Sequence, residues 1–353
     1  MIDLKKFRES PDIYIKSAVA KNCKIDFEHF QKLDKECLNL KLKVENLLSK
    51  RNEVSAKMAN LTKWSDEFKK IVEEVQSMKK DITDLENQYN EKYSEFYSLY
   101  LAIPNPLQDD VPICKDESWN VVLETVGKKA EFDFKPIPHY ELLEKRGMLD
   151  QERSAKISGS RFYYIRWWLV RLELALRNFV LDKLIKKWFE PTMVPNLVKE
   201  EAMMSTGFFP TWKENIYEVN PNDDKLFLIW TSEVPLVAQH IDETLDISQL
   251  PLRYVWISPC YRREAWTYGK DTKWLIRTHQ FDKIEMVTFV TPENSINEHE
   301  FLRSIEEEVF QDLWITYNRI LICSWDLWDP ASKKYDLEAR FPGMERFIEV
   351  TST

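Results

Sequence analysis

Two long runs of regularly spaced apolar residues, separated by a short polar break, most strongly constrain what this chain can fold into. In both runs an apolar side chain recurs every third or fourth position, the first starting at Phe27 and the second following the polar residues 62–66. Each run covers about five heptads with Lys, Glu and Asp between the apolar positions, which is typical of a coiled coil. Two long helices joined by a few residues must fold back on each other. We therefore predict an antiparallel hairpin whose helices are about 50 Å long.

The helical pattern ends at the Ile-Pro-Asn-Pro segment 103–106, since proline cannot continue a helix. Beyond it, short runs rich in β-formers, such as 253–257 and 284–289, mix irregularly with helical stretches such as 169–187. This mixture favours an α+β fold with an antiparallel sheet. We therefore predict two domains, a coiled-coil arm over residues 1–103 and a mixed domain over residues 104–353.

Cysteine usage and charge narrow the class of protein. The five cysteines lie far apart with no CxxC pair, which argues against a zinc site or a disulfide framework and fits a reducing cytosol. Charged residues follow Met1 where a signal peptide would be apolar, and no run approaches the ~18 apolar residues of a membrane span. We expect a cytoplasmic protein with no membrane or DNA partner. The net charge of −9 means that any RNA contact must use local basic patches.

Residues 259–285 hold most of the candidate chemistry. Basic and acidic side chains alternate there on two predicted strands joined by a loop. The inward positions of a hairpin converge, so arginines and carboxylates would share one concave face. Arginine offers forked donors to phosphate oxygens, a glutamate can accept from an adenine amino group or an ammonium, and Phe281 offers a flat face to a base. A solvated charged hairpin fits the same pattern, and the residues alone leave both interpretations open.

Several segments, in the right order, resemble one known family. The segments Pro259-Cys260-Tyr261-Arg262-Arg263-Glu264-Ala265 and 275–285 resemble motif two of seryl-tRNA synthetases almost residue for residue. Thr231-Ser232-Glu233 is similar to the family's serine-binding loop, and residues 335–338 with 349–352 resemble its magnesium and ATP segment. The hairpin resembles the family's tRNA-binding arm. The resemblance implies a class II synthetase, with an N-terminal antiparallel two-helix arm and an antiparallel sheet flanked by helices.

The resemblance also implies individual roles. Arg262 would hold the α-phosphate of ATP, Arg277 would hold phosphate from the opposite strand, Glu264 would accept from the adenine amino group, and Phe281 would stack on the ring. The implied ATP-binding residues are Arg262, Arg263, Glu264, Arg277, Phe281, Glu349, Val350, Thr351 and Ser352, with Arg262 and Arg277 catalytic. The implied serine-binding residues are Thr231, Ser232, Glu233 and Glu285. Glu349 and Ser352 would bind Mg²⁺, which prefers oxygen ligands.

The implied reaction joins L-serine and ATP into seryl-adenylate and then transfers the seryl group to the 3′ end of tRNA(Ser). The resemblance implies a homodimer in the full-length protein and leaves tRNA(Sec) as a second candidate acceptor. One alternative is a homologue that charges a carrier protein, although such homologues lack a long arm. Another is a non-catalytic coiled-coil interaction protein derived from a synthetase. Retention of Arg262, Glu264, Arg277 and Glu285 together speaks against it.

Tryptophan occupies many positions where the family has glycine. The chain has 6 Gly and 13 Trp, whereas ordinary usage would give about 25 Gly. The positions are Trp167, Trp188, Trp230, Trp256, Trp266, Trp274, Trp314, Trp325 and Trp328, while Trp212 falls on an aromatic position. We hypothesise that the gene uses UGA for glycine and that these residues are UGA codons written as tryptophan. Under the alternative, the tryptophans are real and the site is blocked.

The last residues, Ser352 and Thr353, precede the region where the family has motif three and its ATP-binding arginine. We expect the chain as written to be unable to form seryl-adenylate, which ATP–pyrophosphate exchange would test.

Overall fold

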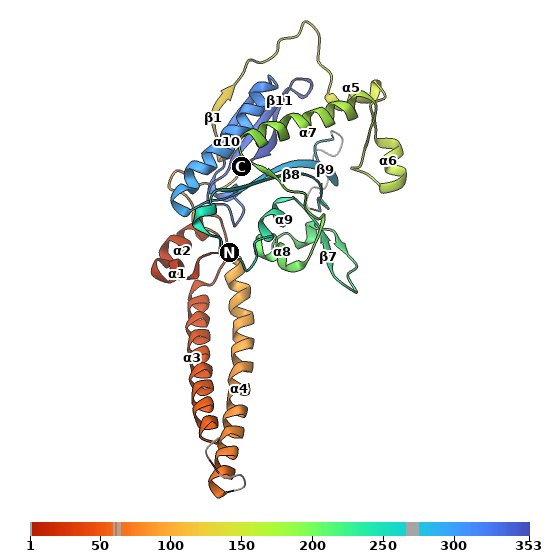
Figure 1. Cartoon of the computed structure of the whole chain (residues 1–353). Helices are drawn as coiled ribbons and strands as arrows, with labels where there is room; N and C mark the ends of the chain where they lie inside the picture. The colour runs from red at the N-terminus through yellow and green to blue at the C-terminus, as the bar shows by residue number, and fades with distance from the viewer. Residues whose placement is uncertain (1, 59–60, 62–64, 266–274) are drawn as a thin grey trace. The chain divides into compact units, whose positions relative to one another are not determined.

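A computed structural model describes residues 2–58, 61, 65–265 and 275–353 of the chain. It divides into two compact units, Met1–Pro106 and Leu107–Thr353 (Figure 1). Trp64 and the two motif-two tryptophans, Trp266 and Trp274, lie outside the described residues. Within the described ranges, no helix combines the length and the apolar character needed to cross a membrane.

The first unit is built on the predicted hairpin of two long helices. α3 (Phe27–Met58) and α4 (Asp66–Ala102) run antiparallel along each other (Figure 1). The Ser65 hydroxyl starts α4 by accepting a 3.1 Å hydrogen bond from the Phe68 amide. Phe30 of α3 is fully buried and stacks on Phe96 of α4 with ring centroids 5.1 Å apart. The apolar seam expected from the periodicity is therefore the hydrophobic core of this unit.

The chain before the hairpin forms two short helices. α1 (Leu4–Glu9) begins at Asp3, whose side chain caps the amides of Lys5 and Lys6. α2 (Pro11–Ala20) begins at Pro11, and a proline at the first position of a helix restarts the helix at no hydrogen-bonding cost. The capping residue Asp3 and the helix-starting Pro11 therefore divide the segment before the hairpin into two helices.

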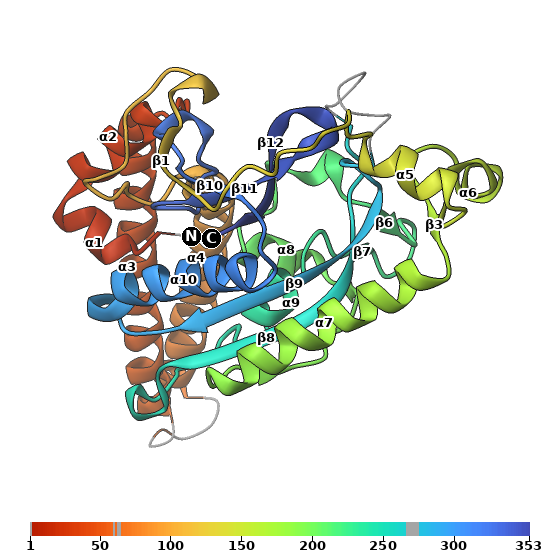
Figure 2. The ribbon, with the colours of Figure 1, turned by 90° about the horizontal axis from the view of Figure 1, so that it is seen from above.

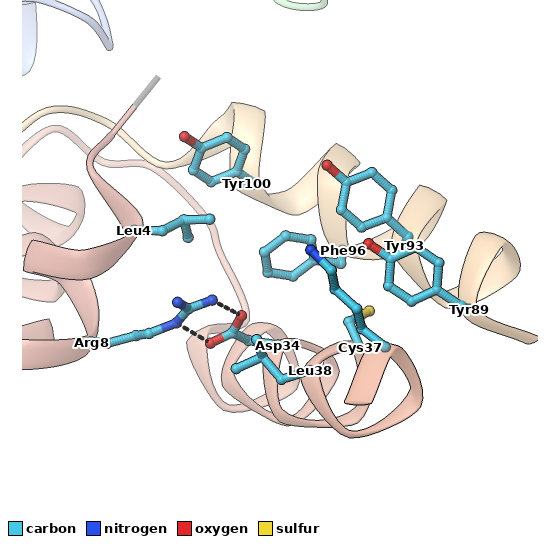
Figure 3. Close-up of a pocket in the computed structure, with 10 residues that line it drawn as sticks. Leu4, Arg8, Asp34, Cys37, Leu38, Tyr89, Tyr93, Phe96 and Tyr100 are labelled. Atoms are coloured by element: carbon cyan, nitrogen blue, oxygen red, sulfur yellow. Dashed lines mark hydrogen bonds and ion pairs between the residues drawn. The ribbon is translucent and has the colours of Figure 1, made fainter. Parts of the chain in front are cut away.

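A small pocket with a volume of about 220 Å³ lies within the first unit (Figure 3). Arg8 of α1 closes one side by donating two hydrogen bonds, of 2.8 and 2.7 Å, to the Asp34 carboxylate of α3. Aromatic side chains of α4, including Tyr89, Tyr93 and Tyr100, line the opposite side (Figure 3). None of the residues singled out by the sequence motifs lines this pocket, so the candidate active site lies elsewhere.

The second unit is an α+β domain, as predicted. Its largest sheet has the order β1-β10-β11-β12 with every pair antiparallel. A second sheet has the order β4-β8-β9, in which β8 pairs antiparallel with β9 over ten residues and β4 pairs parallel with β8. Two smaller sheets are β5-β7-β6 and β2-β3. The strands are β1 (Val121–Val126), β2 (Leu149–Asp150), β3 (Tyr164–Ile165), β4 (Glu190–Pro191), β5 (Leu197–Val198), β6 (Glu218–Val219), β7 (Leu226–Leu228), β8 (Leu252–Tyr261), β9 (Gln280–Phe289), β10 (Tyr317–Leu321), β11 (Tyr335–Phe341) and β12 (Arg346–Ser352).

Two long helices flank the β8–β9 hairpin in Figure 2. Leu184 of α7 and Ile305 of α10 pack with Val255 of β8 in one buried cluster. Phe310, further along α10, packs with Leu337 of β11, so α10 contributes to the cores of both larger sheets. The helices of this unit are α5 (His139–Lys145), α6 (Gln151–Ser158), α7 (Trp168–Lys186), α8 (Glu200–Ser205), α9 (Glu233–Ala238) and α10 (Ser295–Asp312).

The structure corrects one expectation about the cysteines. Cys114 and Cys323 form a disulfide, with their Cα atoms 5.9 Å apart. They are separated by 209 residues in the sequence and meet because β10 pairs with β1 and so returns the chain to the segment that precedes β1. Spacing along the sequence could not reveal this pair, because the sheet topology alone brings the two residues together.

Candidate active site

The β8–β9 hairpin supplies the frame of the candidate site. Its register places Cys260 opposite Phe281 and Trp256 opposite Glu285. Arg262 follows β8 directly, and its amide donates a 2.9 Å hydrogen bond to the carbonyl of His279. The His279 ring lies with Nδ1 2.9 Å from the Arg262 carbonyl oxygen, which can only accept, so Nδ1 is the donor. His279, the residue before β9, therefore holds the backbone of Arg262 in place.

Asn215, a residue that the sequence did not single out, anchors the chain after Arg262. Its backbone carbonyl accepts from the Arg263 amide at 2.9 Å, and its side-chain oxygen accepts from the Ala265 amide at 3.0 Å. Asn215 is buried, 50 residues from Ala265 in the sequence. Arg263 itself is exposed, so the structure fixes its backbone and leaves its side chain at the surface.

Arg262 is the central cation of the site. Its guanidinium carbon lies 4.9 Å from the centre of the Phe281 ring and 4.7 Å from that of Trp230. Burial lowers the Arg262 pKa, while the nearby Glu264, Glu349 and Glu285 carboxylates act in the opposite direction. Among the described residues, the buried Nε of Arg262 has no hydrogen-bond partner. A buried cation with an unused hydrogen-bond donor is suited to bind an anionic ligand.

The Trp230 indole occupies the space next to this guanidinium. Its ring also packs against Phe208 at 5.4 Å and Trp212 at 5.2 Å. Its indole nitrogen is buried and makes no hydrogen bond within the described ranges. A buried donor without a partner is unfavourable. As written, the chain therefore fills with an indole a part of the site that adjoins its main cation.

A cluster of polar side chains, which we call the recess, lies beside Arg262 where the start of α9 meets β9. The Thr231 hydroxyl donates to a Glu285 carboxylate oxygen at 2.7 Å and accepts from the Glu233 amide at 3.1 Å. Lys283 forms an ion pair with Glu285. Burial, helped by the nearby Glu285 charge, raises the pKa of Glu233 to about 7. Two carboxylates and a hydroxyl thus converge, a set of hydrogen-bond acceptors that can bind an ammonium group and a hydroxyl.

Two further residues named in the sequence analysis, Ser232 and Arg277, lie near this cluster and in the loop between β8 and β9. Ser232 is fully buried beside Thr231. Arg277 lies with Nη1 3.3 Å from a Glu264 carboxylate oxygen, and its own side chain is about half exposed. This ion pair links the two ends of the loop that joins β8 to β9.

The β11–β12 register explains how Glu349 and Ser352 can act together. Two residues that are three apart on a regular strand point to opposite faces. Here the register shifts, because Leu337 pairs with Thr351 while Glu338 pairs with Glu349, which leaves Val350 as an extra residue. Since directly paired residues share a face, Glu349 joins Glu338, and Ser352 joins Asp336, on one face of the sheet.

That face is acidic. Burial and the Glu349 charge together raise the Asp336 pKa to about 7, against the opposing effect of Lys334, 3.0 Å away. Carboxylate and hydroxyl oxygens are suitable ligands for Mg²⁺. Within the described residues, however, no three acidic, His or Cys side chains are placed to hold a metal ion by themselves. Magnesium at Glu349 and Ser352 would therefore need further oxygens from a bound ligand.

Glu306 of α10 is a second residue that the sequence did not single out. It accepts a 3.1 Å hydrogen bond from the Thr351 hydroxyl, on the opposite face of β12 from Glu349. Burial, helped by the charges of Asp336 and Glu285 and opposed by the Thr351 hydrogen bond, raises the Glu306 pKa to about 7. In the sequence it is one of three consecutive glutamates on an amphipathic helix, which gives no sign that this one contacts Thr351.

We predict that Glu306→Gln flattens the dependence of stability on pH. Between about pH 4.5 and 7 folded Glu306 keeps a proton that the unfolded chain has released, so the free energy of unfolding falls as pH rises. Glutamine has no such proton. The free energy of unfolding of the variant minus that of its parent should therefore be about 1–3 kcal/mol larger at pH 8 than at pH 4.5. Urea unfolding at several pH values measures this difference. Glu308→Gln, at a neighbouring surface ion pair, serves as the control, and parallel curves for Glu306→Gln and its parent would contradict the prediction.

Two family models match the chain. Residues 1–107 match the seryl-tRNA synthetase N-terminal domain. Residues 214–353 match the core domain of class II tRNA synthetases for G, H, P, S and T. The first match covers the helical unit and the second covers the β8–β9 hairpin, Glu285 and the β11–β12 segment.

Relatives and solved structures agree with these matches. The serine–tRNA ligase of Fervidobacterium nodosum is 39% identical over 355 aligned positions, which cover all of this chain and 83% of the relative. The seryl-tRNA synthetase from Pyrococcus horikoshii complexed with ATP superposes with a TM-score of 0.86 at 34% identity, covering 100% of this chain and 83% of that one. The cytoplasmic serine–tRNA ligase of Naegleria fowleri in complex with AMP gives a TM-score of 0.83 at 26% identity, covering 100% of this chain and 85% of that one. The chain belongs to the seryl-tRNA synthetase family of class II aminoacyl-tRNA synthetases.

Proposed function

We propose that the Arg262 cluster binds ATP and that the Thr231–Glu285 recess beside it binds L-serine, so that the two ligands form seryl-adenylate. The observation that supports this most strongly is a buried guanidinium whose Nε has no partner among the described residues, next to two carboxylates and a hydroxyl. A cation beside an acidic recess suits a phosphate and an ammonium held side by side. The P. horikoshii relative was solved with ATP, which is consistent with this assignment.

The chemistry assigned to the protein is positioning and charge stabilisation. The serine carboxylate attacks the α-phosphorus of ATP, the bond to the bridging oxygen breaks, and pyrophosphate leaves with the bonding electrons. Arg262 would neutralise the negative charge that develops on the α-phosphate, and Arg277 would contact phosphate from the other strand. Phe281 would stack on adenine, and Glu264 would accept from its amino group, with Arg263 at the rim of the site.

We assign Glu349 and Ser352 to Mg²⁺, since their oxygens share one face of β12 across the bulge. The ion would supply positive charge against the phosphates. The neighbouring Val350 and Thr351 would shape this side of the ATP site: the first is exposed and the second is held by Glu306.

We predict that Arg262→Ala weakens binding of a non-hydrolysable seryl-adenylate analogue by about 10–100-fold, the usual range for losing a charge-assisted hydrogen bond. The reference protein carries Trp230→Gly, because the indole lies against the Arg262 guanidinium. Isothermal titration calorimetry gives the two affinities. Arg153→Ala, an exposed arginine on α6, should leave the affinity unchanged, and an equal affinity for Arg262→Ala would refute the role of Arg262.

We predict that two conservative changes in the recess separate recognition of the serine hydroxyl from that of the ammonium. Thr231→Val removes a hydroxyl at constant volume and should lower the preference for a seryl- over an alanyl-adenylate analogue by about fivefold or more. Glu285→Gln removes a charge that faces the ammonium and should weaken both analogues about tenfold or more. Competition binding measures both ratios. Thr288→Val, elsewhere on β9, is the control. An unchanged preference in Thr231→Val would show that a group other than Thr231 recognises the serine hydroxyl.

The seryl group would then pass to the 3′ end of tRNA(Ser), with tRNA(Sec) as a second candidate. We assign tRNA binding to the coiled-coil arm, residues 1–103, and catalysis to residues 104–353. Support comes from the exposed lysines of α3, namely Lys41, Lys43, Lys50 and Lys57. Binding through lysine–phosphate contacts weakens steeply with salt, so a salt-independent affinity for tRNA(Ser) would exclude this assignment.

We also infer a homodimer that acts in the cytoplasm with the other components of protein synthesis; the location rests on the family, since the Cys114–Cys323 disulfide removes the support that the cysteine spacing gave. Leu172, Leu176 and Phe179 recur on one side of α7 and are 65%, 40% and 38% exposed. Such an apolar stripe on a long helix is typical of an interface. Sedimentation equilibrium tests this inference, and a monomer at micromolar concentration would contradict it.

A further inference from the structure

Two tryptophans occupy backbone positions that glycine normally fills at the end of a helix. Trp188 follows α7 with φ of 68°, and Trp314 follows α10 with φ of 56°. The Trp188 amide bonds to the Ile185 carbonyl at 3.0 Å, and the Phe189 amide bonds to that of Leu184 at 3.1 Å. The same two bonds, from residues 314 and 315, close α10 at 3.0 and 2.9 Å. This pair of bonds defines the Schellman motif, whose left-handed residue is usually Gly and sometimes Asn.

Other helices of this chain end in the same motif with the expected residues. Gly147 closes α5 with φ of 63°, Gly207 closes α8 with φ of 82°, and Asn22 closes α2 with φ of 58°. In each of them the left-handed residue and its successor make the same two hydrogen bonds, at 2.8 to 3.1 Å. Trp188 and Trp314 therefore occupy positions that are equivalent to two glycines and one asparagine in the same molecule.

The indoles gain nothing at these positions that could offset the strained backbone. Trp188 is 86% exposed and Trp314 is 93% exposed. The residues after them are the ones that pack: Phe189 joins the buried cluster of Leu184, and Ile315 packs with Phe310. For a bulky side chain a positive φ is a rare outlier, and here neither burial nor packing compensates for it.

Trp167, just before α7, gives a third case of a different type. Its φ of 56° and ψ of −127° lie outside the left-handed helical region. Residues with a side chain rarely adopt this conformation, whereas glycine adopts it readily, as at the first central position of a type II′ turn. Its indole is 77% exposed. All three positions therefore have a glycine backbone and a tryptophan side chain in solvent.

We infer that the protein the cell makes has glycine at positions 167, 188 and 314, and also at 230, because its gene uses UGA as a glycine codon. The backbone argument at the first three positions is independent of the family resemblance and of the proposed function. A single codon reassignment explains three unrelated helix boundaries as well as the scarcity of glycine, 6 residues against 13 tryptophans.

At position 230 the inference deepens the proposed function. Glycine there removes the indole that lies 4.7 Å from the Arg262 guanidinium and the buried indole nitrogen that has no partner in the described ranges. The guanidinium face then opens to a ligand. This consequence rests on the proposed function, whereas the identity of the residue does not.

Trp212 provides an internal control. Its φ of −105° is ordinary for any residue, and it lies on an aromatic position of the family. We therefore expect UGG at codon 212 and UGA at codons 167, 188, 230 and 314. Tandem mass spectrometry of the protein from its native cells should show glycine masses at 188 and 314 and a tryptophan mass at 212. UGG at 188 and 314, or UGA codons with tryptophan in the peptides, would overturn the inference. Neither measurement depends on activity, so failure of the proposed function would not affect them.

A stability measurement tests the backbone argument on recombinant protein. Trp188→Gly and Trp314→Gly should each raise the melting temperature, by about 2–4 °C, because glycine adopts the left-handed conformation without strain. Leu313→Gly is the matched control, since residue 313 has a helical φ of −86° and should lower the melting temperature. A fall in melting temperature for both tryptophan variants would show that the tryptophans suit their positions and would overturn the inference.

Discussion

The ten-residue pairing of β8 with β9 is the constraint on which the rest of the active site depends. It places Phe281 and Glu285 of β9 beside Arg262, the residue that follows β8. A shift of one residue would turn every side chain of the hairpin to the opposite face. The register is fixed outside the strands as well, because Asn215 and His279 bond to the backbone that follows β8. The site is therefore positioned by backbone hydrogen bonds before any ligand enters.

Electrostatics gives this frame its chemical character. Burial lowers the pKa of Arg262, and burial raises the pKa values of Glu233, Glu306 and Asp336 to about 7. Charges of both signs are thus held in a poorly solvated region where their own pairing is incomplete. Such an arrangement opposes folding slightly but favours a ligand that brings complementary phosphate, ammonium and metal charges.

The tryptophans show how strictly a backbone can dictate residue type. Hydrogen bonds at the end of α7 and of α10 require a left-handed residue there, and α2, α5 and α8 meet that requirement with Asn or Gly. Natural sequences are usually consistent between local preference and overall fold. The large exposed indoles that follow α7 and α10 break that consistency in the same way. One reassigned codon explains both, whereas two real tryptophans would need two separate explanations.

The sequence by itself determined the features whose physical cause is local. The 3–4 periodicity specified the coiled-coil hairpin, the prolines of 103–106 ended α4, and the β8–β9 strands with their charged residues lie close enough in the chain to be recognised together. Only the tertiary structure joined Cys114 to Cys323, placed Asn215 against the chain after β8 and Glu306 behind β12, and put Glu349 and Ser352 on one face through a bulge. These contacts depend on sheet topology and register, which bring together residues up to 209 positions apart, and no local pattern encodes such distances.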